Sequence, residues 1–196
     1  MRYFQINNLC DTQDRSLSFI SNGVKKMGLA SYRPAKGKRV GDKYPENAEI
    51  HLQPENPGIK LPNLIGNTKS HLIVNTAMKD TILEYCPGGE VDIEILPFTL
   101  INHKKRVHSK DYWIINPIGT FDCVNRSASE IEFLDDEIVG VDKYVFDPKK
   151  LEKAPHLFRV PEDPTEYFIS QSLAKAFQEK QFTNIFLIEI EQSEED

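Results

Sequence analysis

The chain has 196 residues, of which 39% are hydrophobic and 28% are charged, and this balance predicts a globular rather than a disordered protein. The net charge of −6 disfavours nucleic acid as a partner, because phosphate binding depends on Lys and Arg. No apolar run approaches the roughly 20 residues that cross a membrane, and the first residues lack the apolar stretch of a signal peptide. We therefore expect no membrane partner and a cytoplasmic location.

Length and cysteine usage predict a single domain without cross-links. Cys10, Cys86 and Cys123 are odd in number and form no CxxC pair, which indicates free thiols in a reducing compartment. A chain of this size buries roughly 70% of its unfolded surface, so it needs neither a disulfide nor a metal for stability. We expect one domain spanning residues 1–196.

The first third of the chain predicts an opening strand and an extended flap. Residues 1–7 alternate around Tyr3, Phe4 and Ile6, which is typical of a strand. Residues 16–27 are expected to form a short helix or a mixed segment. Residues 28–67 are rich in Pro, Gly and charge, so we expect short strands, for example at 49–52, within a flap packed over the main body. Within the single domain we thus distinguish an N-terminal strand and flap at residues 1–67 from an α+β core at residues 68–196.

Two segments share one pattern of strand, N-cap, helix and strand. The first runs from Ile73 through Asn75 and a helix to a strand at 91–96, and the second runs from Phe168 through Ser170 and a helix to a strand at 186–191. Asn and Ser both cap helices well, because their side chains accept a free backbone N–H of the first turn. The apolar pairs spaced four residues apart are Met78 with Ile82 and Leu173 with Phe177. The pattern indicates either a duplication or two units that arose independently.

Most of the remaining chain predicts strands punctuated by prolines. They are expected at residues 98–102, 112–115, 121–124, 131–134, 138–146 and 157–160. Together with the two capped helices, these strands predict an α+β fold, a largely antiparallel sheet with two or three helices packed on it.

Acidic charge is concentrated between residues 128 and 147, where seven acids accompany one base, Lys143. Six of these acids are our candidate binding residues: Glu130, Glu132, Asp135, Asp136, Glu137 and Asp142. One interpretation is solvated strand edges, where charge prevents unwanted pairing. The other is an acidic face shaped for a basic partner, with electrostatic steering of the encounter.

The sequence contains no catalytic, cofactor-binding or metal-binding signature. His103 and His108 have four residues between them, but the lysines and arginine among these would repel a metal ion. Cys86 follows a predicted helix, and that end of the helix dipole raises the pKa of a thiol, which disfavours a nucleophile. We therefore predict no catalytic residues, no cofactor and no metal.

The residues alone are also compatible with two other classes of protein, an enzyme and a scaffolding subunit. A small-molecule or nucleotide-binding enzyme would need polar groups that converge in an apolar pocket, and Trp113, His103, Asp111 and Cys123 could supply them. The apolar neighbours of Trp113 favour a place in the core instead. A scaffolding subunit would show a large exposed apolar patch.

One long block and several shorter ones carry a family resemblance. The block is EILPFTLINHKKRVHSKDYWIINPIGTFDCVNRSAS at 94–129, and the others are ENPGIKLPNLIGN at 55–67, HLFRVPE at 156–162 and YFISQSLAKAF at 167–177. From about residue 46 to 191 the chain resembles the immunity-eleven family of bacterial polymorphic toxin systems, earlier known only as a domain of unknown function. It departs from the family pattern at Asn125-Arg126, where an acid is expected, and at Thr183-Asn184, where Gly is common.

The resemblance implies a non-enzymatic protein that binds and neutralises a cognate secreted toxin and so protects the producing cell. Such toxins often carry nuclease domains, and a basic nuclease would suit an acidic partner. The six acids between Glu130 and Asp142 are then the expected toxin-binding residues. The sequence leaves open which toxin is bound and what the oligomeric state is.

Overall fold

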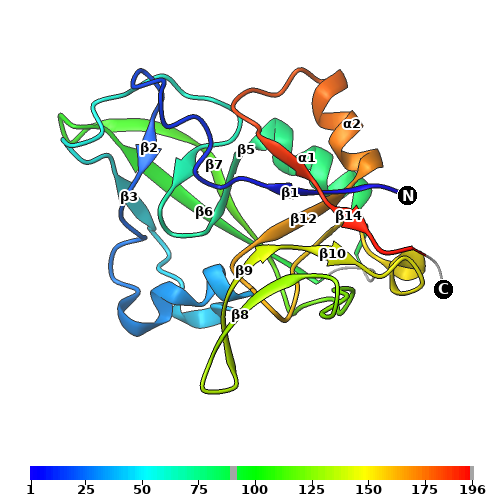
Figure 1. Cartoon of the computed structure of the whole chain (residues 1–196). Coiled ribbons are helices and arrows are strands. Elements are labelled where there is room, and N and C mark those ends of the chain that lie inside the picture. Colours follow the sequence, from blue (N-terminus) through cyan, green and yellow to red (C-terminus); the bar gives the residue numbers. More distant parts are fainter. Residues whose placement is uncertain (89–91, 195–196) are drawn as a thin grey trace.

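The computed structural model describes residues 1–88 and 92–194 as two four-stranded sheets with two α-helices beside them and a hairpin that extends from the body (Figure 1). The helices are α1 (Thr76–Tyr85) and α2 (Gln171–Glu179), with short 3-10 helices η1 (Gly28–Tyr32), η2 (Pro34–Lys36), η3 (Gly41–Lys43) and η4 (Lys150–Lys153). The start of the predicted strand at 91–96 and the last two acids of the chain lie outside the described residues.

Four strands form the first sheet and four others form the second. The first sheet has the order β11 (Leu157–Phe158), β12 (Tyr167–Ser170), β1 (Tyr3–Ile6) and β13 (Leu187–Glu189). The second has the order β3 (Glu49–His51), β6 (Ile93–Ile101), β7 (Val107–Pro117) and β5 (Leu72–Asn75). The smaller pairs are β2 (Phe19–Ile20) with β4 (Gly66–Asn67), β8 (Glu130–Leu134) with β9 (Glu137–Lys143), and β10 (Val145–Phe146) with β14 (Glu191–Gln192). Both four-stranded sheets are mainly antiparallel, which confirms the predicted α+β class.

Both helices begin at the predicted caps. The Asn75 side chain accepts a hydrogen bond from the Met78 amide (3.1 Å), and the Ser170 hydroxyl accepts one from the Leu173 amide (3.3 Å). Each cap occupies a free N–H of the first helical turn. The helices contact each other, and their apolar sides share one core with the sheets.

The two strand–helix–strand units have the same local topology. β5 and β6 both run antiparallel to β7, which lies between them, and β12 and β13 both run antiparallel to β1 in the same way. In each unit the helix therefore connects two parallel strands across an intervening antiparallel one. The central strands come from different places in the chain, β7 directly after β6 and β1 from the N-terminus. Duplication and independent origin of the two units both stay open.

The N-terminal third packs into the body of the protein. β1 lies inside the first sheet, and β3, predicted at 49–52, pairs with β6 at the edge of the second. Val24, Met27 and Ala30 join Ile50 in a hydrophobic core under the second sheet. The segment expected as a flap therefore supplies core side chains.

Of the two alternatives predicted for residues 16–27, the structure has the mixed segment, with β2 and turns in place of a helix. The Ser18 amide donates to the Lys60 carbonyl (2.8 Å), and β2 pairs in parallel with β4. These backbone groups are used for pairing with a segment about 40 residues away. The pattern of residues 16–27 alone does not reveal such a partner, because the partner residues lie far outside this segment.

Candidate functional site

The six candidate acids lie on one hairpin, which we call the acidic hairpin and define as residues 130–143. Its strands β8 and β9 pair only with each other and project from the body at the lower edge of Figure 1. The turn residues Asp135 and Asp136 have φ of +48° and +67°. Two consecutive left-handed residues form the turn type that matches the twist of a tight hairpin, and Asp tolerates that conformation.

The base of the acidic hairpin is fixed to the body while its tip is free. Val141 packs against the hydrophobic core that contains Tyr144 and Phe146. The Ser129 hydroxyl accepts a hydrogen bond from the Val145 amide (2.9 Å). From Val141 toward the tip the hairpin is a two-stranded sheet, and among the described strands β8 and β9 pair only with each other. An isolated two-stranded hairpin is only marginally stable in water, so contact with a partner would order this one further.

The carboxylates of the acidic hairpin are exposed and unpaired. All six candidate acids are exposed, and none has an ion-pair partner among the described residues. Lys143, the single base of the hairpin, pairs with Glu191 at 2.9 Å. Lys143 lies opposite Glu130 in the hairpin and interacts with its charge, but its ion pair is with Glu191. The other five acids leave the hairpin with a concentrated negative charge facing solvent.

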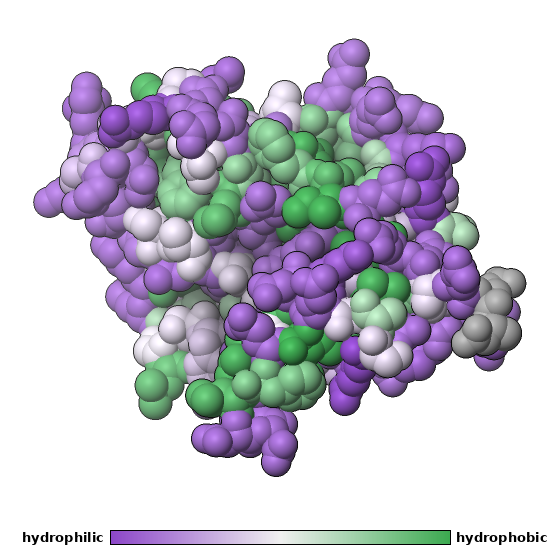
Figure 2. Space-filling model, in the orientation of Figure 1, coloured by the Kyte–Doolittle hydropathy of each residue, from purple (hydrophilic) through white to green (hydrophobic). Residues whose placement is uncertain are grey.

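Large apolar side chains stand among these acids, which the sequence reading missed. Phe133, Leu134 and Val139 are 60%, 64% and 58% exposed. In Figure 2 the lower edge of the molecule is hydrophobic above a hydrophilic tip, at the place where Figure 1 shows the hairpin. The available signal was the alternation of apolar residues along 131–134, but such alternation ordinarily indicates a half-buried strand.

An exposed aromatic ring surrounded by carboxylates is suited to binding a protein. Apolar anchors that become fully desolvated supply most of the affinity at protein interfaces, and charges around them speed the encounter. The acidic hairpin offers both within 14 residues and holds no nucleophile or general base beyond its solvated acids. It is therefore our candidate functional site.

The histidines weighed as metal ligands instead hold a loop in place. His103 Nε2 lies 3.1 Å from the Gln53 carbonyl and 3.0 Å from that of Asn56. His108 Nε2 lies 2.8 Å from the Ile59 carbonyl. Their ring nitrogens thus bind loop 53–59 to the end of the β6–β7 hairpin. Across residues 1–88 and 92–194 the structure gathers no group of three or more side chains able to hold a metal ion.

The structure does not bring the residues of the enzymatic alternative together. Trp113 packs partly buried against the core shared by the helices, and its indole N–H donates to Thr76 Oγ1 (2.9 Å). Cys123 is buried in a different core, where burial raises the pKa of its thiol, so it is held protonated. Asp111 is exposed, and His103 is used by loop 53–59.

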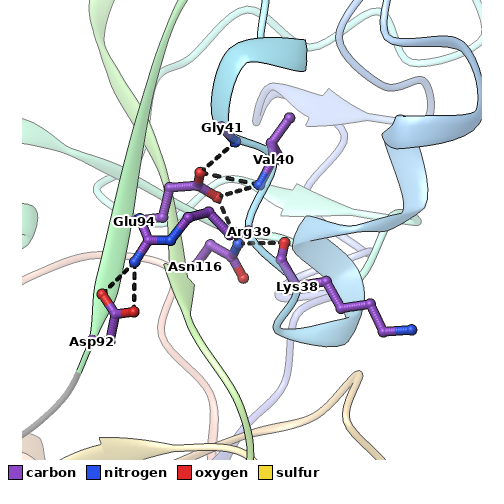
Figure 3. Close-up of polar contacts among 7 residues, drawn as sticks. All are labelled: Lys38, Arg39, Val40, Gly41, Asp92, Glu94 and Asn116. Atoms are coloured by element: carbon purple, nitrogen blue, oxygen red, sulfur yellow. Dashed lines mark hydrogen bonds and ion pairs between the residues drawn. The ribbon is translucent and has the colours of Figure 1, made fainter.

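A buried carboxylate on β6 is held by several hydrogen bonds (Figure 3). Glu94 is 8% exposed and accepts hydrogen bonds from the amides of Val40 (3.0 Å) and Gly41 (2.9 Å) and from Asn116 Nδ2 (3.0 Å). Asn116 also donates to the Lys38 carbonyl (3.1 Å). These hydrogen bonds join the amides of Val40 and Gly41 to Glu94 on β6. They therefore fix loop 38–41 to the second sheet.

Replacing Glu94 with Gln is expected to lower the free energy of unfolding by about 2 kcal/mol, because glutamine keeps a single acceptor oxygen and its N–H₂ would face another donor, either Asn116 Nδ2 or a backbone amide. Urea denaturation at 25 °C measures the loss. Asp92→Asn is the matched control, since its ion pair with Arg39 is largely exposed and should contribute little to stability. Equal losses in the two variants would contradict a structural role specific to Glu94.

Three further findings do not concern a single site. Among the helices in the described part of the chain, none combines the length and apolar character needed to cross a bilayer. A family model for the immunity protein family Imm11 matches residues 5–192, which confirms the family expected from the sequence blocks. A search of the curated proteins found no match.

Proposed function

Since this chain belongs to the Imm11 immunity protein family, we propose that it protects the cell that makes it by binding and neutralising a cognate toxin domain. The proposed action is binding alone, in the cytoplasm, by covering the toxin's active site or holding its mobile elements. Such an interface typically buries about 800 Å² on each partner.

The observation that supports this proposal is the acidic hairpin. It combines exposed Phe133, Leu134 and Val139 with six unpaired carboxylates on an element that projects from the body. A buried aromatic anchor ringed by charge is the arrangement that tight protein interfaces favour. We propose Glu130, Glu132, Asp135, Asp136, Glu137 and Asp142 as toxin-binding residues, with the three apolar side chains as anchors.

The charge of the hairpin favours a basic toxin surface. Nucleases present Lys and Arg to the phosphates of their substrate, and a row of carboxylates can occupy the same positions. A nuclease domain is therefore the toxin class that we propose.

Co-expression with the toxin-like domain encoded beside this chain tests the function. Cells producing the toxin domain alone should die, and cells producing both proteins should survive and yield a complex that survives purification. Undiminished killing without complex formation, repeated with every toxin-like neighbour, would reject the immunity role.

Charge reversal on the hairpin should have a larger effect on the rate of association with the toxin domain than on the stability of the fold. The triple variant Glu132→Lys, Glu137→Lys and Asp142→Lys is expected to lower the association rate at least about tenfold at low salt, because steering by the hairpin is lost. Stopped-flow binding at two ionic strengths measures the effect, which should shrink as salt rises.

The matched control reverses three exposed acids elsewhere, Glu46, Glu55 and Glu152, and so changes the net charge equally. An equal loss of rate in both variants would assign the effect to net charge and remove the support for this hairpin.

A further inference from the structure

A cationic cavity lies on the N-terminal third of the protein. It is lined by η1, by the segment before it and by the turn that connects β4 to β5, and its volume is about 470 Å³. Lys26 and Lys69 line it together with the hydroxyl groups of Ser31, Tyr32 and Thr68. No described residue of its lining is an acid, although the protein as a whole carries a net charge of −6. This local excess of positive charge favours an anionic ligand.

His71, which also lines the cavity, is a buried side chain without a partner. The residue is 3% exposed, and its Nε2 has no hydrogen-bond partner among the described residues. Buried polar atoms are nearly always hydrogen-bonded, because leaving one unpaired costs the full desolvation of that group. An orphaned ring nitrogen beside a cavity is therefore the signature of a missing partner.

The surroundings of His71 decide what kind of partner it can take. Burial, the charge of Arg159 and the charge of Lys69 lower the pKa of His71 to about 4, so the ring is neutral at pH 7 and has one N–H to donate. The guanidinium of Arg159 bonds to the carbonyls of Pro34 and Ala35 and to the Tyr167 hydroxyl, and none of these groups cancels its charge. Glu166 interacts with the charge of Arg159, but the charges that act on His71 itself, those of Arg159 and Lys69, are both positive.

We propose that this cavity binds a phosphate-class oxyanion, with Lys26 and Lys69 supplying charge and His71 donating a hydrogen bond from Nε2. The cavity is larger than a free phosphate ion, and the exposed ring of Tyr32 at its rim offers a surface for stacking. The ligand is then either the free ion or a phosphorylated small molecule. This site is independent of the acidic hairpin and of toxin binding.

Titration of the ¹⁵N-labelled full chain with inorganic phosphate at pH 7 and constant ionic strength tests the site. The chemical shifts of the His71 ring nitrogens and of the amides of residues 68–71 report binding. We expect saturable shifts, and an affinity at least about tenfold weaker in the Lys26→Ala, Lys69→Ala double variant. The control double variant, Lys25→Ala with Lys36→Ala, removes the same charge from exposed lysines outside the cavity lining and should bind within about twofold of the parent.

Adenosine monophosphate and adenosine distinguish the two sources of phosphate. Tighter binding of the monophosphate than of phosphate would identify a phosphorylated small molecule stacked on Tyr32, and equal binding would identify the free ion. Three results would overturn the proposal: shifts that do not saturate, equal weakening in both double variants, or adenosine binding as tightly as its monophosphate.

Discussion

Replacing Phe133 and Leu134 with Ser is expected to weaken binding of the toxin domain at least about a hundredfold while leaving the fold intact. Both side chains are mainly exposed in the free protein, so removing them takes little from the core. In a complex each would be desolvated, and the loss of a central anchor typically costs 2 kcal/mol or more. Isothermal calorimetry with the purified toxin domain measures the change in affinity.

Exposed apolar residues on another element provide the control for this variant. Phe186 precedes β13 and Ile188 lies within it, and both are exposed. Phe186→Ser with Ile188→Ser should leave the affinity within about threefold, because surface changes outside the interface have small effects. If the two double variants lost affinity equally, or if only the β13 variant lost it, the anchors would have to be sought outside the acidic hairpin.

Replacing Arg159 with Met is expected to lower the free energy of unfolding by about 3 kcal/mol or more. Arg159 is fully buried, and its guanidinium donates to the carbonyls of Pro34 (2.6 Å), Ala35 (2.9 Å) and Pro164 and to the Tyr167 hydroxyl (2.6 Å). Methionine fills much of the volume but leaves the three carbonyls without this donor, while the Tyr167 hydroxyl still accepts from the Leu72 amide (3.1 Å). Each buried unpaired group costs about 1–3 kcal/mol.

The thermal midpoint gives a direct readout of this loss. A chain of this length should lose about 2–4 °C per kcal/mol, so we expect a fall of about 10 °C. The guanidinium also lies 3.9 Å from the centroid of the Tyr167 ring, a contact that Lys at position 159 could keep only in part. Arg106→Met removes an exposed arginine and should change the midpoint by less than about 2 °C. A midpoint for Arg159→Met as high as for Arg106→Met would show that this network is dispensable.

The elements that the sequence predicted correctly are those specified by neighbouring residues. Asn75 and Ser170 cap their helices because the acceptor and the free amide are three residues apart. The strands around Trp113 follow from local alternation and from prolines that end them.

The features that the sequence could not predict depend on distant residues. β2 forms because its partner lies at 66–67, and Glu94 is satisfied by amides more than 50 residues away. The exposure of Phe133 and Leu134 reflects the absence of any covering layer over the acidic hairpin in the described structure, which alternation along one strand does not reveal. The unpaired nitrogen of His71 is a property of three-dimensional packing alone.

Backbone hydrogen exchange of the purified complex with the toxin domain tests the central claim most directly. The account predicts that amides of residues 130–143 exchange slower in the complex than in the free protein, because a marginally stable two-stranded hairpin becomes buried and ordered. Unchanged exchange in these residues, with new protection confined to another surface, would contradict the assignment of the acidic hairpin as the toxin-binding element.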